Sequence, residues 1–306
     1  MTAEGAFRRI SIRSHAKINL FLRVFGKRAD GYHAVQTLML PIGLADEITL
    51  RPVSGRGIEL RCSDLSLPAG RANLAWRAAE LLQSRLHVRR GVRIFIRKRI
   101  PVGAGLGGGS SNASAVLVGL NRLWKLGLSE DRLERLAAEL GSDTAFFIRN
   151  RPALCEGRGE ILTPVSFRHP SRLFLLNFGF GSSTAWAYGH LDHDVQRGEA
   201  AGIDEALRRA VEAAGIGNWA GLLCSSLGFR NDLDAPVFRK FPILRMARDF
   251  LREQPGVIGA AMSGSGSTIF AALRSADAAK AVKSAVAERF GRTVWRWTGP
   301  TISSLP

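Results

Sequence analysis

Alternating apolar and polar positions characterise the first clearly patterned stretch of the chain. From Ala16 to Val24 every second residue is apolar, which is the period of a β-strand. The turn-forming sequence Arg28-Ala29-Asp30-Gly31 separates this stretch from a second apolar run over residues 34–42. The pattern therefore predicts a long β-hairpin near the start of the chain.

Helical periodicity follows the hairpin. Apolar residues three or four apart predict helices over 72–85 and 110–126, and a third that Ser129 caps and Gly141 ends. Hairpins mixed with helices, without strict strand–helix alternation, predict an α+β fold of mixed sheets and helices. The other elements expected are strands at 92–98, 173–177 and 268–272, helices near 203–214, 217–226, 236–254 and 276–290, and a glycine loop at 263–267.

Length indicates more than one average domain. The chain has 306 residues, about twice the roughly 150 of a typical domain. The order of elements repeats in kind, although not in sequence, beyond residue 165. We expect an N-terminal domain over 1–165 and a C-terminal domain over 166–306, with Arg168-His169-Pro170 as the candidate boundary.

The charge balance raises the question of an anionic partner. Lysine and arginine total 43 against 26 acidic residues, a net charge of +17. This charge is spread over the chain, and its densest stretch, residues 93–99, alternates like a strand with one solvated face. A basic nucleic-acid-binding protein is one reading, and an anionic small-molecule substrate explains the sign equally well. We expect no nucleic-acid partner.

Cysteine usage and hydropathy predict a cytoplasmic protein. Cys62, Cys155 and Cys224 are odd in number and fit no metal-ligand or disulfide spacing, so buried reduced thiols are expected. Two uncharged stretches, 100–121 and 255–273, carry too much Gly, Ser and Asn to lie in lipid. No signal-peptide pattern precedes the first strand, and no membrane association is expected.

The strongest chemical signal is the segment from Pro101 to Ser114. It holds five glycines in seven residues, between a predicted strand and a predicted helix. Glycines let a ligand approach the main chain, and a helix N-terminus offers free amides to phosphate. No lysine follows Gly109, which excludes a Walker A loop, and no acidic strand end follows to support a dinucleotide fold. The segment predicts a phosphate-binding loop of another type.

This loop resembles the second signature of the GHMP kinase superfamily, Pro-x-x-x-Gly-Leu-Gly-Ser/Gly-Ser/Gly-Ser. Residues 16–22 (AKINLFL) resemble the first motif of that family, and residues 261–268 (AMSGSGST) resemble the third. The three motifs occur in family order over nearly the whole chain. The resemblance implies an ATP-dependent small-molecule kinase, with the nucleotide between the glycine loop and the third motif and Mg²⁺ arriving with ATP. It names no metal ligands.

A narrower resemblance concerns the substrate. The turn Lys27–His33 (KRADGYH) and the triple glycine at 107–109 resemble the superfamily member that phosphorylates the 2-hydroxyl of a cytidine diphosphate-linked methylerythritol, in the non-mevalonate isoprenoid pathway. A kinase for another small alcohol is the alternative within the family, and a panel of substrates separates the two. Nucleic-acid binding, from a different class, predicts steeply salt-dependent binding to any duplex.

The resemblance also implies catalytic roles for two residues. Asp143, in Gly141-Ser142-Asp143-Thr144, matches the aspartate of a family motif and would accept the proton of the attacking hydroxyl. Lys17 would keep that carboxylate ionised and stabilise the negative charge that develops during transfer. The alternatives are a turn or cap aspartate and a solvent-facing strand lysine.

Binding residues are carried over from the same motifs. Asn73 and Lys98 would lie near the adenine, although Lys98 could equally be a solvated charge. Tyr32 would stack on cytosine and His33 would hydrogen-bond its edge, while Tyr188 stands where the family has Phe, and Ala185 where it has Pro. The expected ATP-binding residues are Asn73, Lys98, Pro101, Gly103, Gly105, Leu106, Gly107, Gly108, Gly109, Ser110, Ser111 and Asn112. The expected substrate-binding residues are Asn19, Tyr32, His33, Thr184, Tyr188, Gly264, Ser265 and Gly266.

Overall fold

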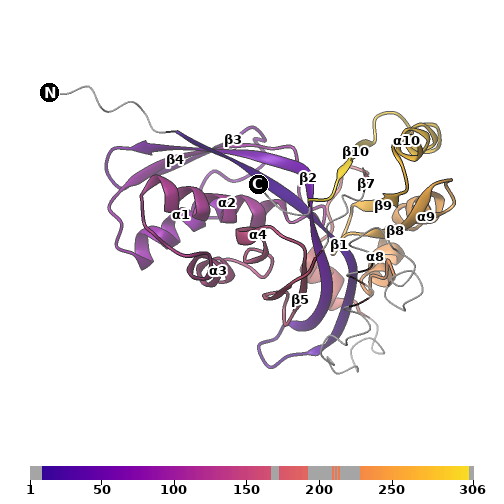
Figure 1. Cartoon of the computed structure of the whole chain (residues 1–306), viewed down its shortest axis with the longest axis horizontal. Helices are drawn as coiled ribbons and strands as arrows, with labels where there is room; N and C mark the ends of the chain where they lie inside the picture. Colours follow the sequence, from indigo (N-terminus) through magenta and orange to yellow (C-terminus); the bar gives the residue numbers. More distant parts are fainter. Residues whose placement is uncertain are drawn as a thin grey trace. The chain divides into compact units, whose positions relative to one another are not determined.

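The chain folds into two compact units that interleave along the sequence. The computed structural model describes residues 9–166, 172–191, 209, 211, 213 and 228–302. The first unit comprises Met1–Ala16, Leu44–Ile100 and Gly107–Asn150, and the second comprises Lys17–Gly43, Pro101–Leu106 and Arg151–Pro306. Both contain helices and sheets (Figure 1), which confirms the predicted α+β class. The tripeptide 168–170, Cys224 and most of the helices expected at 203–214 and 217–226 lie outside the described residues.

The predicted hairpin is present and longer than expected. Strand β1 runs over Ile10–Lys27 and β2 over His33–Val53. At the turn the Arg28 amide donates to the Tyr32 carbonyl at 2.7 Å, and the Gly31 amide donates to the Arg28 carbonyl at 3.0 Å. Gly31 has φ of +84°, a left-handed conformation that glycine adopts without steric cost. The Asp-Gly signal thus placed this turn correctly.

The sheet of the first unit has one covered and one open face. Strand β4 (Gly91–Arg97) pairs antiparallel with the second half of β2 and parallel with β3 (Ile58–Cys62). Helices α1 (Leu74–Arg85) and α2 (Gly108–Leu123) lie along one face (Figure 1). A Cβ on Gly119 of α2 would lie 2.4 Å from Leu50 Cδ1, so a larger residue there would require the Leu50 side chain to move. Helices α3 (Glu130–Ala138) and α4 (Phe146–Arg149) follow.

The second unit contains the hairpin end and a second sheet. The first half of β2 pairs with β5 (Ala153–Glu156), which pairs with β6 (Ile161–Pro164). The second sheet is antiparallel and its strand order is β10-β7-β9-β8. Its strands are β7 (Arg172–Asn177), β8 (Val257–Met262), β9 (Ile269–Leu273) and β10 (Trp295–Pro300), and the described helices of this unit are α5 (Thr184–Gly189), α8 (Asp234–Lys240), α9 (Pro242–Arg252) and α10 (Ala276–Phe290).

One predicted helix is wrong. The single helix expected over 236–254 is two helices, α8 and α9, because Phe241 leaves the helical region with φ of −128° and ψ of 76°. Pro242 is the first residue of α9, and a residue that precedes proline is pushed towards extended backbone. Strands β3, β5, β6, β8 and β10 and helices α4 and α5 were not predicted, since most are too short to show a period.

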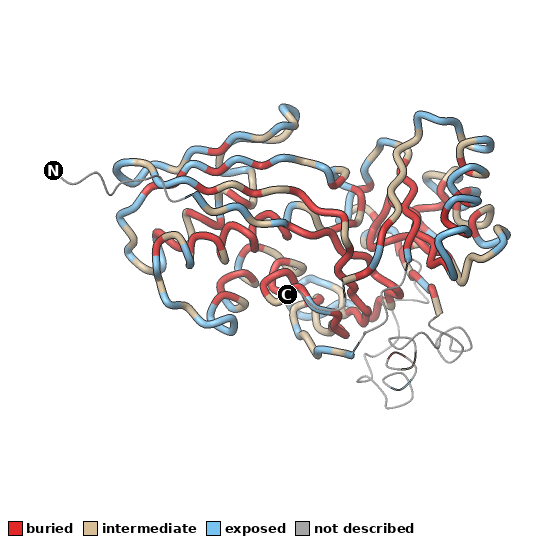
Figure 2. The backbone as a smooth tube through the Cα atoms, turned by 45° about the horizontal axis from the view of Figure 1, so that its top comes forward, coloured by how far each residue is buried: buried red, intermediate tan, exposed pale blue. Residues whose placement is uncertain are grey.

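The alternation of apolar and polar residues in β1 suggests one buried and one exposed face, but the structure buries both. Residues 14–22 are all buried (red in Figure 2), so both faces of the strand are covered. Lys17 is 3 % exposed, and the alternative of a solvent-facing lysine is therefore wrong. Cys155 is buried as expected, whereas Cys62 is partly exposed. No helix in the described part of the chain is long and apolar enough to cross a membrane.

Candidate functional site

The first half of the glycine segment packs against the third motif inside the second unit. Gly103 and Gly105 have φ of +64° and +74°. A Cβ on Gly105 would lie 2.0 Å from the Ser263 carbonyl oxygen, a distance that no side chain tolerates. The Thr268 amide donates to the Ala104 carbonyl at 3.2 Å. Glycine at position 105 is therefore required by a close approach of two loops.

The second half of the segment opens α2 in the first unit. Gly107 is the N-cap, in the left-handed region at φ of +69°, and makes no side-chain capping hydrogen bond. The first amides of a helix have no partner within the helix and carry partial positive charge. A Cβ on Gly108 would lie 3.1 Å from Ile100 Cγ2 and 3.3 Å from Lys98 Nζ. This helix end has the chemistry of an anion-binding element.

Lys98 is held in the interior by an aspartate that the sequence analysis did not single out. Asp46 is fully buried and accepts four hydrogen bonds, from Lys98 Nζ at 2.5 Å, from the amides of Arg99 and Ile100 at 2.7 and 2.9 Å, and from Asn112 Nδ2 at 2.9 Å. The Lys98 side chain is 8 % exposed, so the alternative of a solvated charge is wrong. The sequence gives only a weak signal for Asp46, which stands beside Glu47 in a strand-like run.

Other expected ATP-site residues use their side chains locally. Asn73 is the N-cap of α1, where its Oδ1 accepts from the Ala75 amide at 3.0 Å. The hydroxyl groups of Ser111 and Ser14 lie 2.7 Å apart, and Asn112 also donates to Ser14 at 2.8 Å. The Ser111 and Asn112 side chains fasten the start of α2 to Ser14 of β1, so these two residues have only their main-chain amides left to face a ligand.

All three motifs meet around Gly264 in the second unit. The Lys17 amide donates to the Leu106 carbonyl at 3.1 Å, which joins the first motif to the second. Lys17 Nζ donates to Asn19 Oδ1 at 2.5 Å. A Cβ on Gly264 would lie 3.2 Å from Asn19 Oδ1 and 3.3 Å from both Lys17 Nζ and the Gly105 carbonyl oxygen. The fold thus brings together residues separated by about 245 positions in the sequence.

Polar contacts fix this junction from both sides. Asn19 Nδ2 donates to Thr37 Oγ1 at 2.8 Å, which orients the amide so that its oxygen faces Lys17. Asn231 Nδ2 donates to the carbonyl groups of Met262 and Gly264 at 2.9 and 2.7 Å. Asn231 is 5 % exposed and was not predicted as part of the site. Its two hydrogen bonds hold the main chain of the third motif in place.

The tyrosines and His33 lie together at the end of the hairpin. His33 Nδ1 lies 3.0 Å from the Phe25 carbonyl oxygen, and its ring stacks on Tyr188 with centroids 5.7 Å apart. Tyr32 is 54 % exposed, and the Arg158 guanidinium lies 5.0 Å from its ring centroid. Aromatic rings of this kind can stack on a planar base, and a histidine can hydrogen-bond its edge.

Thr184 and Ser265 connect this surface to the third motif. Their hydroxyl oxygens lie 2.8 Å apart, and Thr184 begins α5, the helix that carries Tyr188. Gly266, the last expected substrate residue of the motif, has φ of +82°, and a Cβ there would lie 2.6 Å from Met262 Sδ. The left-handed backbone of Gly266 favours glycine whatever the space around it, and a side chain there would also displace Met262.

Asp143 lies in a turn of the first unit between α3 and α4. The Thr144 amide donates to the Gly141 carbonyl at 3.1 Å, and Ser114 Oγ of α2 donates to the Thr144 carbonyl at 2.6 Å. These bonds tie the turn to the helix that the glycine segment opens. In the described residues no three His, Cys, Asp or Glu side chains converge as a metal site.

Comparison with known families gives the class of the protein. Residues 73–151 match the GHMP kinase N-terminal domain and residues 203–292 match the GHMP kinase C-terminal domain. A homoserine kinase structure from Cytophaga hutchinsonii shares the fold, with a TM-score of 0.72 at 15 % identity, over 99 % of this chain and 98 % of that one. The class defined by fold and motifs is that of the GHMP kinases.

Relatives define the position within that class. The 4-diphosphocytidyl-2-C-methyl-D-erythritol kinase of Syntrophotalea carbinolica is 39 % identical over 94 % of this chain and 96 % of its own. The enzyme of the same name from a Synechococcus strain is 41 % identical over 90 % and 89 %. A crystal structure of 4-(cytidine 5'-diphospho)-2C-methyl-D-erythritol kinase is 35 % identical, covers 95 % of this chain and 99 % of that one, and has a TM-score of 0.76. The chain belongs to the 4-diphosphocytidyl-2-C-methyl-D-erythritol kinase family of GHMP kinases.

Proposed function

We propose that this protein transfers the γ-phosphoryl group of ATP to the 2-hydroxyl of 4-diphosphocytidyl-2-C-methyl-D-erythritol. The observation that carries the proposal is the meeting of the three motifs at Gly264, where Lys17, Asn19 and the Gly105 carbonyl converge. Similarity to relatives of this name over nearly the whole chain supports the choice of substrate. We place the reaction in the cytoplasm on the cysteine pattern alone.

The glycine segment would hold the phosphates of ATP. The left-handed glycines at 103, 105 and 107 keep side chains away from the main chain there, and the amides at the start of α2 offer donors to phosphate oxygens. Magnesium, expected with ATP, would neutralise phosphate charge and be bound mainly by phosphate oxygens. Ser111 and Asn112 would act through their backbone amides, because their side chains bond Ser14.

Transfer itself needs a base for the hydroxyl proton and a cation for the developing charge. The substrate oxygen would attack the γ-phosphorus while the bond from phosphorus to the bridging oxygen breaks, which releases ADP. Asp143 would take the proton of the hydroxyl, and Lys17 would stabilise the negative charge. Asn19 would orient Lys17, since its side-chain oxygen accepts from Nζ at 2.5 Å.

Cytosine would bind at the hairpin end. Tyr32 is exposed and next to His33, and the His33 ring lies against Tyr188. Tyr32 and Tyr188 would contact the base through their rings, and His33 would hydrogen-bond its edge. Thr184 and Ser265 would border this site on the side of the third motif.

The first experiment is a direct assay. Purified protein with ATP, Mg²⁺ and the cytidine diphosphate alcohol should form ADP and the phosphorylated product. Homoserine, mevalonate and galactose serve as matched alcohols and should give little ADP. Comparable turnover of one of these alcohols would show that the substrate assignment is wrong. The absence of turnover of every alcohol by folded protein would refute the proposed kinase activity.

A second experiment tests the base. Asp143→Asn keeps the shape of the side chain and removes its charge, so kcat should fall at least about 10²-fold while ATP still binds. ATP binding by calorimetry is the control, because it separates loss of chemistry from loss of folding. Near-normal kcat in the folded variant would exclude Asp143 as the base.

A further inference from the structure

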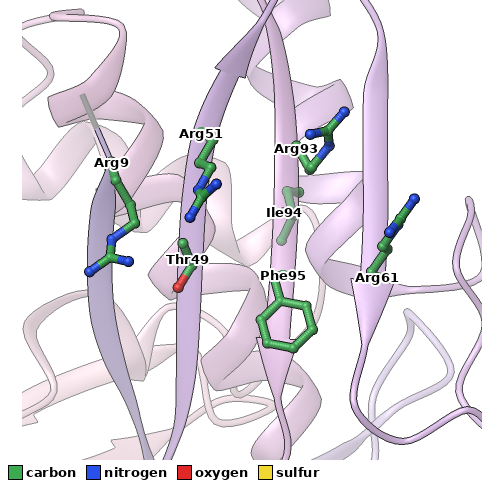
Figure 3. Close-up of a pocket in the computed structure, with 7 residues that line it drawn as sticks. All are labelled: Arg9, Thr49, Arg51, Arg61, Arg93, Ile94 and Phe95. Atoms are coloured by element: carbon green, nitrogen blue, oxygen red, sulfur yellow. The ribbon is translucent and has the colours of Figure 1, made fainter. Parts of the chain in front are cut away.

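The open face of the first unit's sheet carries a basic groove that the kinase reaction does not use. It has a volume of about 340 Å³, the lower end of the range for small-molecule sites. The strands β1, β2, β4 and β3 cross it side by side (Figure 3). The lining residues on which the argument depends are Arg9, Thr49, Arg51, Arg61, Arg93 and Phe95.

The registers of the strands place these side chains in two adjoining rows. Arg51 of β2 lies opposite Arg93 of β4. In the next row Phe95 of β4 lies between Thr49 of β2 and Arg61 of β3. Residues directly opposite on neighbouring strands have Cβ atoms about 4.5–5.5 Å apart, and like charges placed so destabilise the sheet. An anion bound across the rows would remove this repulsion.

Acidic residues compensate only part of this charge. Arg93 donates to Glu59 at 2.7 Å, and this bond lowers the pKa of Glu59, with a smaller contribution from Arg61. Within the described chain, Arg9, Arg51 and Arg61 form no ion pair closer than the 4.0 Å that defines one. Towards the other end of β4 the arrangement differs, because Arg97 and Arg99 both pair with Glu47, at 3.6 and 2.8 Å.

Phe95 adds a feature that a merely solvated basic face does not need. Its side chain is 42 % exposed, although its neighbours Ile94 and Ile96 point into the core and are buried. Guanidinium groups bind phosphate oxygens in a bidentate way, and an exposed aromatic ring can stack on a planar base. A nucleotide offers both chemistries, a phosphate chain for guanidinium groups and a planar base for the ring.

We propose that this groove binds a nucleoside di- or triphosphate, with its base on Phe95 and its phosphates on Arg51 and Arg61. The groove belongs entirely to the first unit, and the proposal does not depend on the kinase activity. A groove of about 340 Å³ lies at the lower end of the range for small-molecule sites, which favours one nucleotide over a strand of several. An oligonucleotide is therefore the alternative that the test must exclude.

Photoaffinity labelling with 8-azido-GTP tests this site on the full chain. After irradiation and digestion, mass spectrometry should find label on peptides from β2, β3 or β4 that contain Arg51, Arg61 or Phe95. Unlabelled GTP should compete at this peptide in a saturable manner. Labelling confined to other peptides, with none on these strands, would overturn the proposal.

Variants separate the phosphate contacts from the stacking contact. Arg51→Gln/Arg61→Gln should weaken GTP competition at this peptide at least tenfold. The control Arg97→Gln/Arg99→Gln removes the same charge from paired arginines and should change it less than threefold. Phe95→Ser should weaken it about fivefold or more, whereas Phe95→Tyr should retain it. Equal losses in the two double variants would show a general charge effect and refute the site.

Competitors identify the ligand class. GTP should compete at least tenfold better than inorganic tripolyphosphate, because only GTP carries a ring. A single-stranded octanucleotide that competes better than GTP, with a steep salt dependence, would refute a mononucleotide site. Turnover of the cytidine substrate should be unchanged in Arg51→Gln/Arg61→Gln, so failure of this proposal and failure of the proposed kinase activity give different results.

Discussion

Loss of the ion pair between Asp46 and Lys98 should destabilise the first unit. The loss of unfolding free energy should depend on which of the two residues is replaced. Lys98→Met removes one of four donors from Asp46 and leaves the amides of Arg99 and Ile100 and Asn112 Nδ2 in place. A hydrogen bond to a charged group contributes about 1.5–3 kcal/mol. We expect Lys98→Met to lower the free energy of unfolding by about 2–3 kcal/mol.

Asp46→Asn should cost more. The amides of Arg99 and Ile100 both donate to Oδ1, which an asparagine oxygen can replace. Lys98 Nζ and Asn112 Nδ2 both donate to Oδ2, where the variant would present an NH₂ group to two donors. Leaving one partner of a buried ion pair costs about 3–5 kcal/mol, so we expect a loss in that range.

Urea unfolding of the nucleotide-free protein, followed by fluorescence and circular dichroism, measures both effects. The midpoint should shift with little change in slope. Glu47→Gln is the matched control, because Glu47 adjoins Asp46 but is 44 % exposed where it pairs with Arg99, and exposed pairs contribute about 0–1 kcal/mol. If Asp46→Asn is no more destabilising than Glu47→Gln or Lys98→Met, the reasoning from its four donors is refuted.

Three further outcomes are expected. Gly105→Ala, whose Cβ would lie 2.0 Å from the Ser263 carbonyl, should weaken ATP binding at least tenfold by calorimetry, and unchanged affinity would contradict the close approach. Tyr32→Ala should weaken binding of the cytidine substrate about 5- to 150-fold and Tyr32→Phe only slightly, with ATP affinity as the control. Burial, opposed by Arg248, raises the pKa of Asp234 from 3.8 to about 7, so the folded protein holds a proton there that the unfolded chain releases. Stability should consequently fall as pH rises from about 4 to 7, and Asp234→Asn should flatten that slope in urea midpoints; an identical slope would exclude Asp234 as its source.

Local features of the fold could be predicted from the sequence where the backbone conformation or a cap strongly favours one type of residue. Ser129 caps its helix as expected, with its side chain accepting from the Arg132 amide, and the Asp-Gly turn closes the hairpin. The glycine segment was recognised because left-handed backbone and close approach select glycine at 103, 105 and 107. Such positions can be recognised from the sequence without knowledge of the fold.

Contacts between distant segments were not predictable in the same way. Asp46 is one of two adjacent acids in the strand, and only the fold shows that Asp46 is the one that meets Lys98 and Asn112. Nothing in the sequence marks Asn231 either, and only the structure shows that its side-chain amide donates to the carbonyl groups of Met262 and Gly264. Lys17 looked able to face solvent because strand alternation shows which residues share a face and does not show whether both faces are covered.

The interleaving of the two units has a consequence for how the chain can be divided. The backbone passes from one unit to the other at residues 16–17, 43–44, 100–101, 106–107 and 150–151. A fragment that starts at residue 166 would keep all four strands of the second sheet but would lack Lys17–Gly43 and Pro101–Leu106 of the same unit. A cut between residues 165 and 166 would therefore leave the first unit whole in the N-terminal fragment and divide the second unit between the two fragments. Lys17, Asn19, Gly105 and Gly264 all belong to the second unit, so the contacts around Gly264 require both parts of the chain.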